Sequence, residues 1–105
     1  MNAYELIKTA AEMAEVAKAQ GYPAPTSLGT SHFYDDNGGH DGIHVHTEHK
    51  AEDFFAWTAF LDADQLDYPE DREGDADGNT YAFGTFAGVR VQVFTGALPK
   101  VQVSA

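Results

Sequence analysis

The chain has 105 residues, 43% of them hydrophobic and 12% aromatic, and it contains no cysteine. This length fits one domain with a single core, the apolar content excludes a disordered tail, and disulfides and cysteine-ligated metals are excluded. Seventeen acidic residues against six basic ones give a net charge of −11, which opposes binding to nucleic acid or to an anionic membrane.

The first expected element is an amphipathic helix over residues 3–20. Apolar side chains recur there at the spacing of one helical face, as in Leu6, Ala10 and Met13. Asn2 can cap its start, and Gly21 can end it in the left-handed conformation.

Residues 26–34 and 43–47 are expected to form the two strands of a hairpin. The segment between them, 35–42, is dense in Asp, Asn and Gly and predicts a long loop. In the second strand two apolar residues alternate with two histidines, so the apolar pair should face the core and the histidines should face away: Ile43 and Val45 against His44 and His46.

Residues 50–62 are the most hydrophobic segment and predict a second helix, with Trp57 in the core. An acidic loop at about 62–79 follows it, and Leu66 and Tyr68 near its start are expected to pack against the core. The carboxylates expected to be solvated there, and available to a partner, are those of Glu70, Asp71, Glu73, Asp75 and Asp77.

Residues 80–95 predict a second hairpin, in which Val89, Val91 and Val93 alternate and should face the core. Its turn is either a two-residue turn at Ala87 and Gly88 or a longer one, and the choice shifts the strand register by one residue. Val101 and Val103 can add a short edge strand.

These elements predict one α+β domain over residues 1–105, in the order α-β-β-α-β-β. We expect a four- to five-stranded antiparallel sheet with both helices packed on one face.

The outer face of that sheet is the first candidate site. In the tight-turn register Tyr81, Phe83 and Phe94 lie on it together, beside Arg90 and Gln92. Three aromatics on an exposed face suggest contact with another protein or with a second copy of the chain. The alternative is a register shift that buries Phe83 and leaves scattered exposed rings.

The histidines are the second candidate site. His44 and His46 are separated by one strand residue and should point the same way, which can offer two imidazoles to one divalent transition metal. His49 and His32 could complete the ligand set. The alternative is a set of solvent-facing histidines with no cofactor.

The layout resembles small uncharacterised accessory proteins of actinobacteria and their phages. The features that carry the resemblance are an Ala-rich first helix, the segment Gly21–Ser27, the apolar run Phe54–Trp57 and the closing hairpin Gly84–Val91. The resemblance implies an accessory protein of the host cytoplasm with no catalytic residue to carry over.

The function expected from these features is that of a non-enzymatic, acidic protein-binding module. It would engage a host protein through its acidic loop, by mimicry of nucleic-acid charge, or through its outer sheet face. The alternative is a small metal-binding protein or metal-dependent enzyme that uses His44 and His46. The first residues show no secretory signal, so we expect a cytoplasmic protein.

Overall fold

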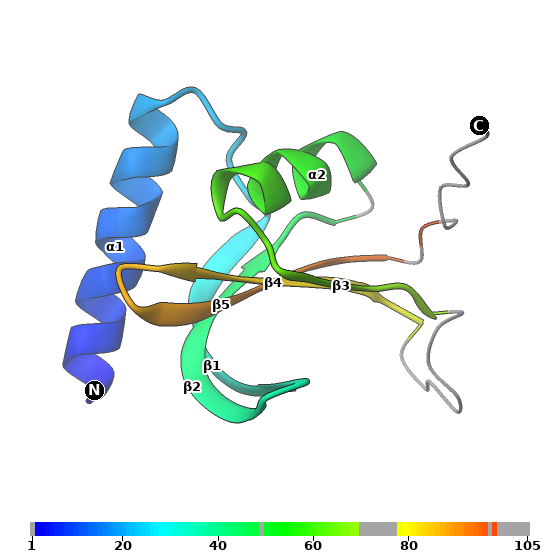
Figure 1. Cartoon of the computed structure of the whole chain (residues 1–105). Helices are drawn as coiled ribbons and strands as arrows, with labels where there is room; N and C mark the ends of the chain where they lie inside the picture. The colour runs from blue at the N-terminus through cyan, green and yellow to red at the C-terminus, as the bar shows by residue number, and fades with distance from the viewer. Residues whose placement is uncertain (1, 49, 70–77, 97, 99–105) are drawn as a thin grey trace.

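The computed structural model describes residues 2–48, 50–69, 78–96 and 98. Two helices lie on one side of a five-stranded sheet, whose strands are ordered β1-β2-β5-β4-β3 (Figure 1). The α+β class and the packing of both helices on one face are confirmed. The sheet is mixed rather than wholly antiparallel, because the central strands β2 and β5 run parallel. No helix in the described ranges is long and apolar enough to cross a membrane.

Helix α1 (Ala3–Ala19) forms as expected. The Asn2 side chain accepts a hydrogen bond from the backbone N–H of Glu5 at 3.0 Å, which satisfies a donor that the helix start leaves unpaired. Gly21 adopts a φ of 82° just beyond the helix, as the left-handed ending requires. The buried side of α1 is the predicted apolar stripe, including Leu6, Ala10 and Met13.

Strands β1 (Ser27–Asp35) and β2 (Gly38–His46) pair over their full length. The expected long loop over 35–42 is wrong, because the connection is only the two residues Asp36 and Asn37. The Asp35 carboxylate accepts the backbone N–H of Asn37 at 2.8 Å and so stabilises this tight turn. The glycine-rich segment therefore extends the strands and does not interrupt them.

Helix α2 (Ala51–Phe60) covers the same face as α1. Trp57 is 1% exposed, which confirms its predicted place in the core, and its indole N–H donates to the carbonyl of Pro23 at 2.9 Å. The start of the expected acidic loop is instead strand β3 (Gln65–Asp67), which pairs with β4. Tyr68 is buried as expected, whereas Leu66 is exposed.

Strands β4 (Thr80–Phe86) and β5 (Val89–Thr95) pair antiparallel in the tight-turn register. Ala87 and Gly88 adopt φ values of 49° and 79°, so both central residues of the turn have the positive φ that a type I′ turn needs. The three valines of β5 are buried against the helices, as predicted. Val101 and Val103 lie outside the described residues.

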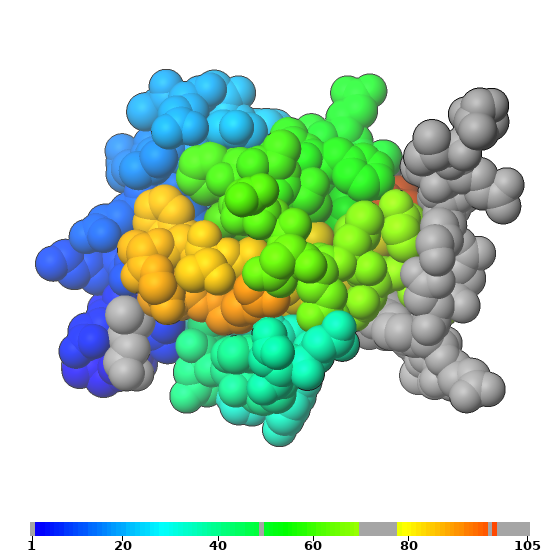
Figure 2. Space-filling view, in the orientation of Figure 1, coloured from blue at the N-terminus to red at the C-terminus, as the bar shows by residue number. Residues whose placement is uncertain are grey.

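The β1–β2 hairpin curls over the face of the sheet that is opposite the helices (Figure 1), and the space-filling view shows it lying directly against β4 and β5 (Figure 2). Its turn reaches strand β3, where the backbone N–H of Asp36 donates to the side-chain oxygen of Gln65 at 3.1 Å. Gly42 permits this curvature. A Cβ atom at that position would overlap the carbonyl oxygen of Arg90 and lie 2.9 Å from the ring of Phe33.

We expect Trp57→Ala to lower the free energy of unfolding by about 3–5 kcal/mol, because it removes a fully buried indole and leaves a cavity. Urea denaturation followed by circular dichroism measures this change. A loss below about 1 kcal/mol would contradict the placement of Trp57 at the centre of the core.

We expect Gly42→Ala to lower the free energy of unfolding by about 1–3 kcal/mol, because backbone and ring atoms already fill the space of the added methyl group. Gly29→Ala is the matched control on the same face of the same hairpin. Its Cβ would meet the movable imidazole of His44 at 3.2 Å, so the loss should stay below about 1 kcal/mol. Equal losses in both variants would show that the close approach at Gly42 is not a constraint.

Candidate functional site

The outer face of the sheet, opposite the helices, carries a row of aromatic rings. Tyr81 pairs directly with Phe94 across strands β4 and β5, and their ring centroids are 5.9 Å apart. Phe83 stacks beside Tyr81 with a centroid separation of 6.3 Å. The predicted gathering of these three rings on one face is therefore confirmed.

His44 and His46 extend the row onto strand β2. The parallel pairing of β2 with β5 puts His46 opposite Phe94, and their rings stack at 4.6 Å with an angle of 10° between the planes. His44 lies opposite Gln92, with its ring 6.2 Å from that of Phe94. We call the half-buried members of this surface the outer-face site: His44, His46, Tyr81, Gln92 and Phe94.

Phe83 does not belong to the accessible part of this surface. It lies on the outer face as predicted, but it is only 2% exposed. The curled hairpin covers it with Phe33, and the centroids of the two rings are 6.0 Å apart. The guanidinium carbon of Arg90 lies 6.0 Å from the centre of the same ring. The expectation that Phe83 offers contact area to a partner is therefore wrong, although the strand register behind it is right.

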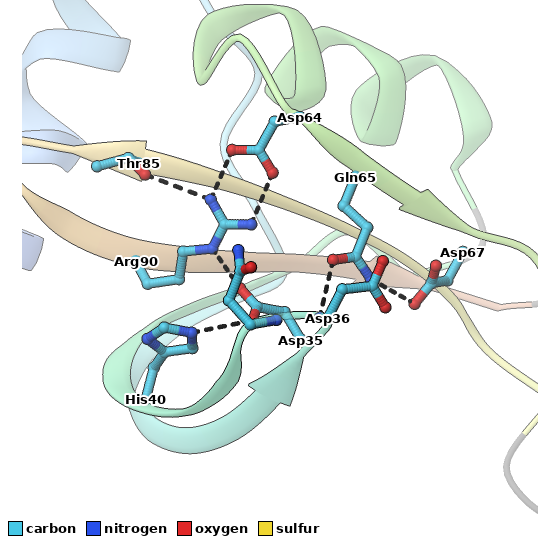
Figure 3. A network of polar contacts seen from close by, with 9 residues as sticks. Asp35, Asp36, His40, Asp64, Gln65, Asp67, Thr85 and Arg90 are labelled. Carbon is cyan, nitrogen blue, oxygen red and sulfur yellow. Dashed lines mark hydrogen bonds and ion pairs between the residues drawn. The ribbon is translucent and has the colours of Figure 1, made fainter.

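Arg90 holds the curled hairpin in place (Figure 3). Its Nε donates to the carboxylate of Asp35 at 2.6 Å, and its two terminal nitrogens donate to the two oxygens of Asp64, each at 2.7 Å. The Arg90 side chain is 11% exposed and that of Asp35 is fully buried. Arg90 thus ties β5 to the end of β1 and to the residue before β3, and it is not available as the partner-binding residue that the sequence suggested.

The electrostatics of Asp35 follow from this arrangement. Burial alone would raise its pKa, but hydrogen bonds from the backbone of Asn37, from His40 and from Arg90, with the positive charge of Arg90, lower the pKa to about 2. The hydrogen bonds from Arg90 also lower the pKa of Asp64, and the two carboxylates raise the pKa of Arg90. The two carboxylates and the Arg90 guanidinium are therefore ionised at neutral pH.

His40 completes the cluster through its Nε2, which lies 3.0 Å from Asp35. A histidine oriented by a carboxylate can serve as a general base. Here, however, Arg90 binds the same carboxylate. The contact between His40 and Asp35 therefore helps to hold the hairpin in place. The sequence did not single out His40 or Asp64, and the only signal for them was a lone arginine among the valines of an otherwise uncharged strand.

The three candidate metal ligands that the structure describes, His32, His44 and His46, do not lie together. His44 and His46 share the outer face, but alternation along β1 puts His32 on the opposite face, where its Nδ1 lies 2.7 Å from Asp41. His49 lies outside the described residues. Within the described part of the chain, no three His, Asp or Glu side chains are grouped to hold a metal ion. The metal hypothesis stays a prediction that rests on His44 and His46.

A polar hollow of about 300 Å³ adjoins the outer-face site, between the tip of the curled hairpin and strands β3 and β4. Aromatic rings, side-chain amides and carboxylates line it, and Gln65 donates to the carboxylate of Asp67 at 2.9 Å within it. Arg90 already binds Asp35, but the carboxylates of Asp36 and Asp67 beside aromatic rings favour a cationic group over an anion. Its lining residues are Tyr34, Asp35, Asp36, Gln65, Asp67, Tyr81, Phe83 and Gln92.

The five predicted acidic contact residues, Glu70, Asp71, Glu73, Asp75 and Asp77, lie outside the described residues. No known protein family, curated protein or solved structure matches the chain.

The pKa of Asp35 predicts how stability changes with acid. Because its pKa is lowered from 3.8 when unfolded to about 2 when folded, Asp35 stabilises the protein above about pH 4 and loses this effect as the pH falls toward 2. Urea denaturation at pH 4 and pH 2 should show a smaller loss of stability in Asp35→Asn than in the unmodified protein.

The same variant should be less stable at pH 7 by about 3 kcal/mol, since it leaves the Arg90 charge without its buried carboxylate partner. Asp36→Asn, one residue along the chain and exposed, is the control and should keep the unmodified acid response. An identical acid response in all three proteins would refute the assignment.

Proposed function

We propose that the chain is a non-enzymatic protein-binding module, a phage or mobile-element accessory protein that acts in the host cytoplasm. Its partner is a host protein that presents a basic segment with apolar residues to the outer-face site. The observation that carries the proposal is the continuous row of half-buried rings, which lies on a rigid sheet beside a hollow lined with carboxylates.

The rings suit protein recognition because aromatic side chains give a large contact area at a small cost in conformational entropy. Phe94 is central to the row: it contacts His46, His44 and Tyr81 from the middle of the surface. A fixed backbone below the rings adds to this, because β5 is paired on both sides. Binding to such a surface needs little reorganisation of the protein.

Charge selects a basic partner. The chain has a net charge of −11, and the hollow beside the rings adds the carboxylates of Asp36 and Asp67 to that general attraction. A lysine or arginine side chain in the hollow would contact both a carboxylate and an aromatic face. The acidic segment Glu70–Asp77 would extend the same attraction, in the manner of a nucleic-acid mimic.

We expect Phe94→Ser to abolish capture of the partner, because it removes the central ring of the outer-face site. Phe55→Ser is the matched control, since Phe55 is an exposed phenylalanine on α2, on the helix side of the sheet. Affinity capture from host extract with the three proteins as baits should yield a basic protein that the unmodified chain and Phe55→Ser retain.

The captured protein, once purified, should bind more weakly as salt rises, because surface charge attraction is screened. Its affinity for Phe94→Ser should fall by at least tenfold in isothermal titration calorimetry. If Phe94→Ser binds as tightly as Phe55→Ser, the outer-face site is not the binding surface. If the captured protein is acidic, the charge argument fails.

A further inference from the structure

The most exposed large apolar side chains of the described residues gather on two neighbouring elements. Tyr4 is 86% exposed and Ile7 57% on helix α1, and Tyr34 is 71% exposed on strand β1. None of them is a member of the outer-face site, although Tyr34 also lines the polar hollow beside it. Large exposed apolar side chains can mark an interaction surface, so helix α1 and strand β1 need their own explanation.

Strand β1 is an edge of the sheet and has none of the usual protection against pairing. It is nine residues long and contains no proline, and no Asp, Glu, Lys or Arg occurs between Lys18 and Asp35. The opposite edge, β3, is three residues long, includes Asp67 and follows Asp64. Long uncharged edge strands are the ones that accept another strand, whereas short charged edges resist it.

Helix α1 adds its own apolar flank to this edge. Ala3 lines one surface hollow together with Thr30 and Ser31 of β1. Ala14 lines a second hollow together with Leu28 of β1. One side of α1 therefore lies along strand β1. Ile7 is four residues from Ala3 and seven from Ala14, which places it on the same flank. The exposed side chain of Ile7 therefore belongs to the β1 edge of the molecule.

We propose that the occupant of this edge is a second copy of the chain, bound by antiparallel pairing of β1 with β1 about a two-fold axis at Ser31. This register pairs all nine residues of the strand. It sets Leu28 opposite Tyr34 of the second copy. An aromatic–aliphatic pair of this kind stabilises neighbouring strands.

An apolar hollow of about 210 Å³ beside Leu28 supports the same arrangement. Its walls include Tyr22, Pro23, Pro25 and Trp57. Tyr34 of the second copy approaches this hollow when it lies opposite Leu28, so the exposed ring of Tyr34 would cover an apolar hollow. Asp35 is the one acidic residue of β1 and is paired with Arg90, so two chains of charge −11 can approach along this strand with little local repulsion.

Sedimentation equilibrium of the full chain should show a dimer that tightens as salt is raised, because salt screens the remaining repulsion. Ser31→Lys should give a monomer with an unchanged circular dichroism spectrum, since it sets two ammonium groups against each other at the two-fold axis. Ala59→Lys, an exposed position on α2, is the charge-matched control and should remain dimeric.

A cysteine at position 31 tests the register directly, because the chain has no cysteine of its own. Ser31→Cys should form a disulfide-linked dimer under mild oxidation, since residues opposite each other in an antiparallel pair bring their Cβ atoms near the distance that a disulfide needs. Ala59→Cys should cross-link at least tenfold more slowly.

A monomer at millimolar concentration would overturn the proposal, as would a dimer that survives Ser31→Lys. A dimer that is lost in Phe94→Ser but retained in Ser31→Lys would assign self-association to the outer-face site instead. The proposal does not rest on the proposed function, because Ser31→Lys should still capture the basic partner and Phe94→Ser should still dimerise.

Discussion

The buried ion pair between Arg90 and Asp35 determines the shape of the outer face. It joins the last strand to the far end of the first hairpin, with the Arg90 Nε 2.6 Å from the carboxylate, and so closes the hairpin over the sheet. This closure buries Phe83 and forms one wall of the polar hollow. The accessible rings are then limited to those beyond the reach of the hairpin, around Phe94. The Arg90–Asp35 ion pair is buried and cannot itself contact a partner, but it determines which residues of the outer face are accessible to one.

The two sides of the sheet differ in how they are closed. The side under the helices is sealed by aliphatic packing, with Val91 and Val93 fully buried. The other side is closed over only part of its area, by the Arg90 ion pairs, the Asp36–Gln65 hydrogen bond and the Phe33–Phe83 ring contact, and it leaves a half-buried aromatic row. The edges are equally unlike, since β1 is nine residues long and its one acidic residue, Asp35, is paired with Arg90, while β3 is three residues long and includes Asp67. The first difference leaves the outer-face site accessible, and the second leaves the β1 edge accessible. These are the two surfaces at which separate contacts are proposed.

The sequence allowed the helices, the final hairpin and the core face to be predicted, because they depend on local spacing. The alternating valines of β5 and the cap at Asn2 are patterns of this kind. The parallel pairing of β2 with β5 could not be predicted from the sequence, since it joins residues 48 positions apart, such as Ile43 and Val91. The burial of Phe83 was missed for a related reason: it depends on Gly42 and Arg90 meeting across two strands. Strand β3 is too short, in too acidic a segment, for alternation to reveal it.

The central position of β5 affects how the chain can fold while it is being synthesised. Strand β2 lies between β1 and β5, so until residues 89–95 have left the ribosome its parallel neighbour is absent. Ile43 and Val45 then remain on an open strand edge without the valines that cover them in the finished core. The native pairing of β2 with β5 must wait until β5 has been synthesised, which is typical of topologies rich in distant contacts. Incomplete chains that end in the acidic segment would expose this edge, and the strong negative charge would then keep them apart in solution.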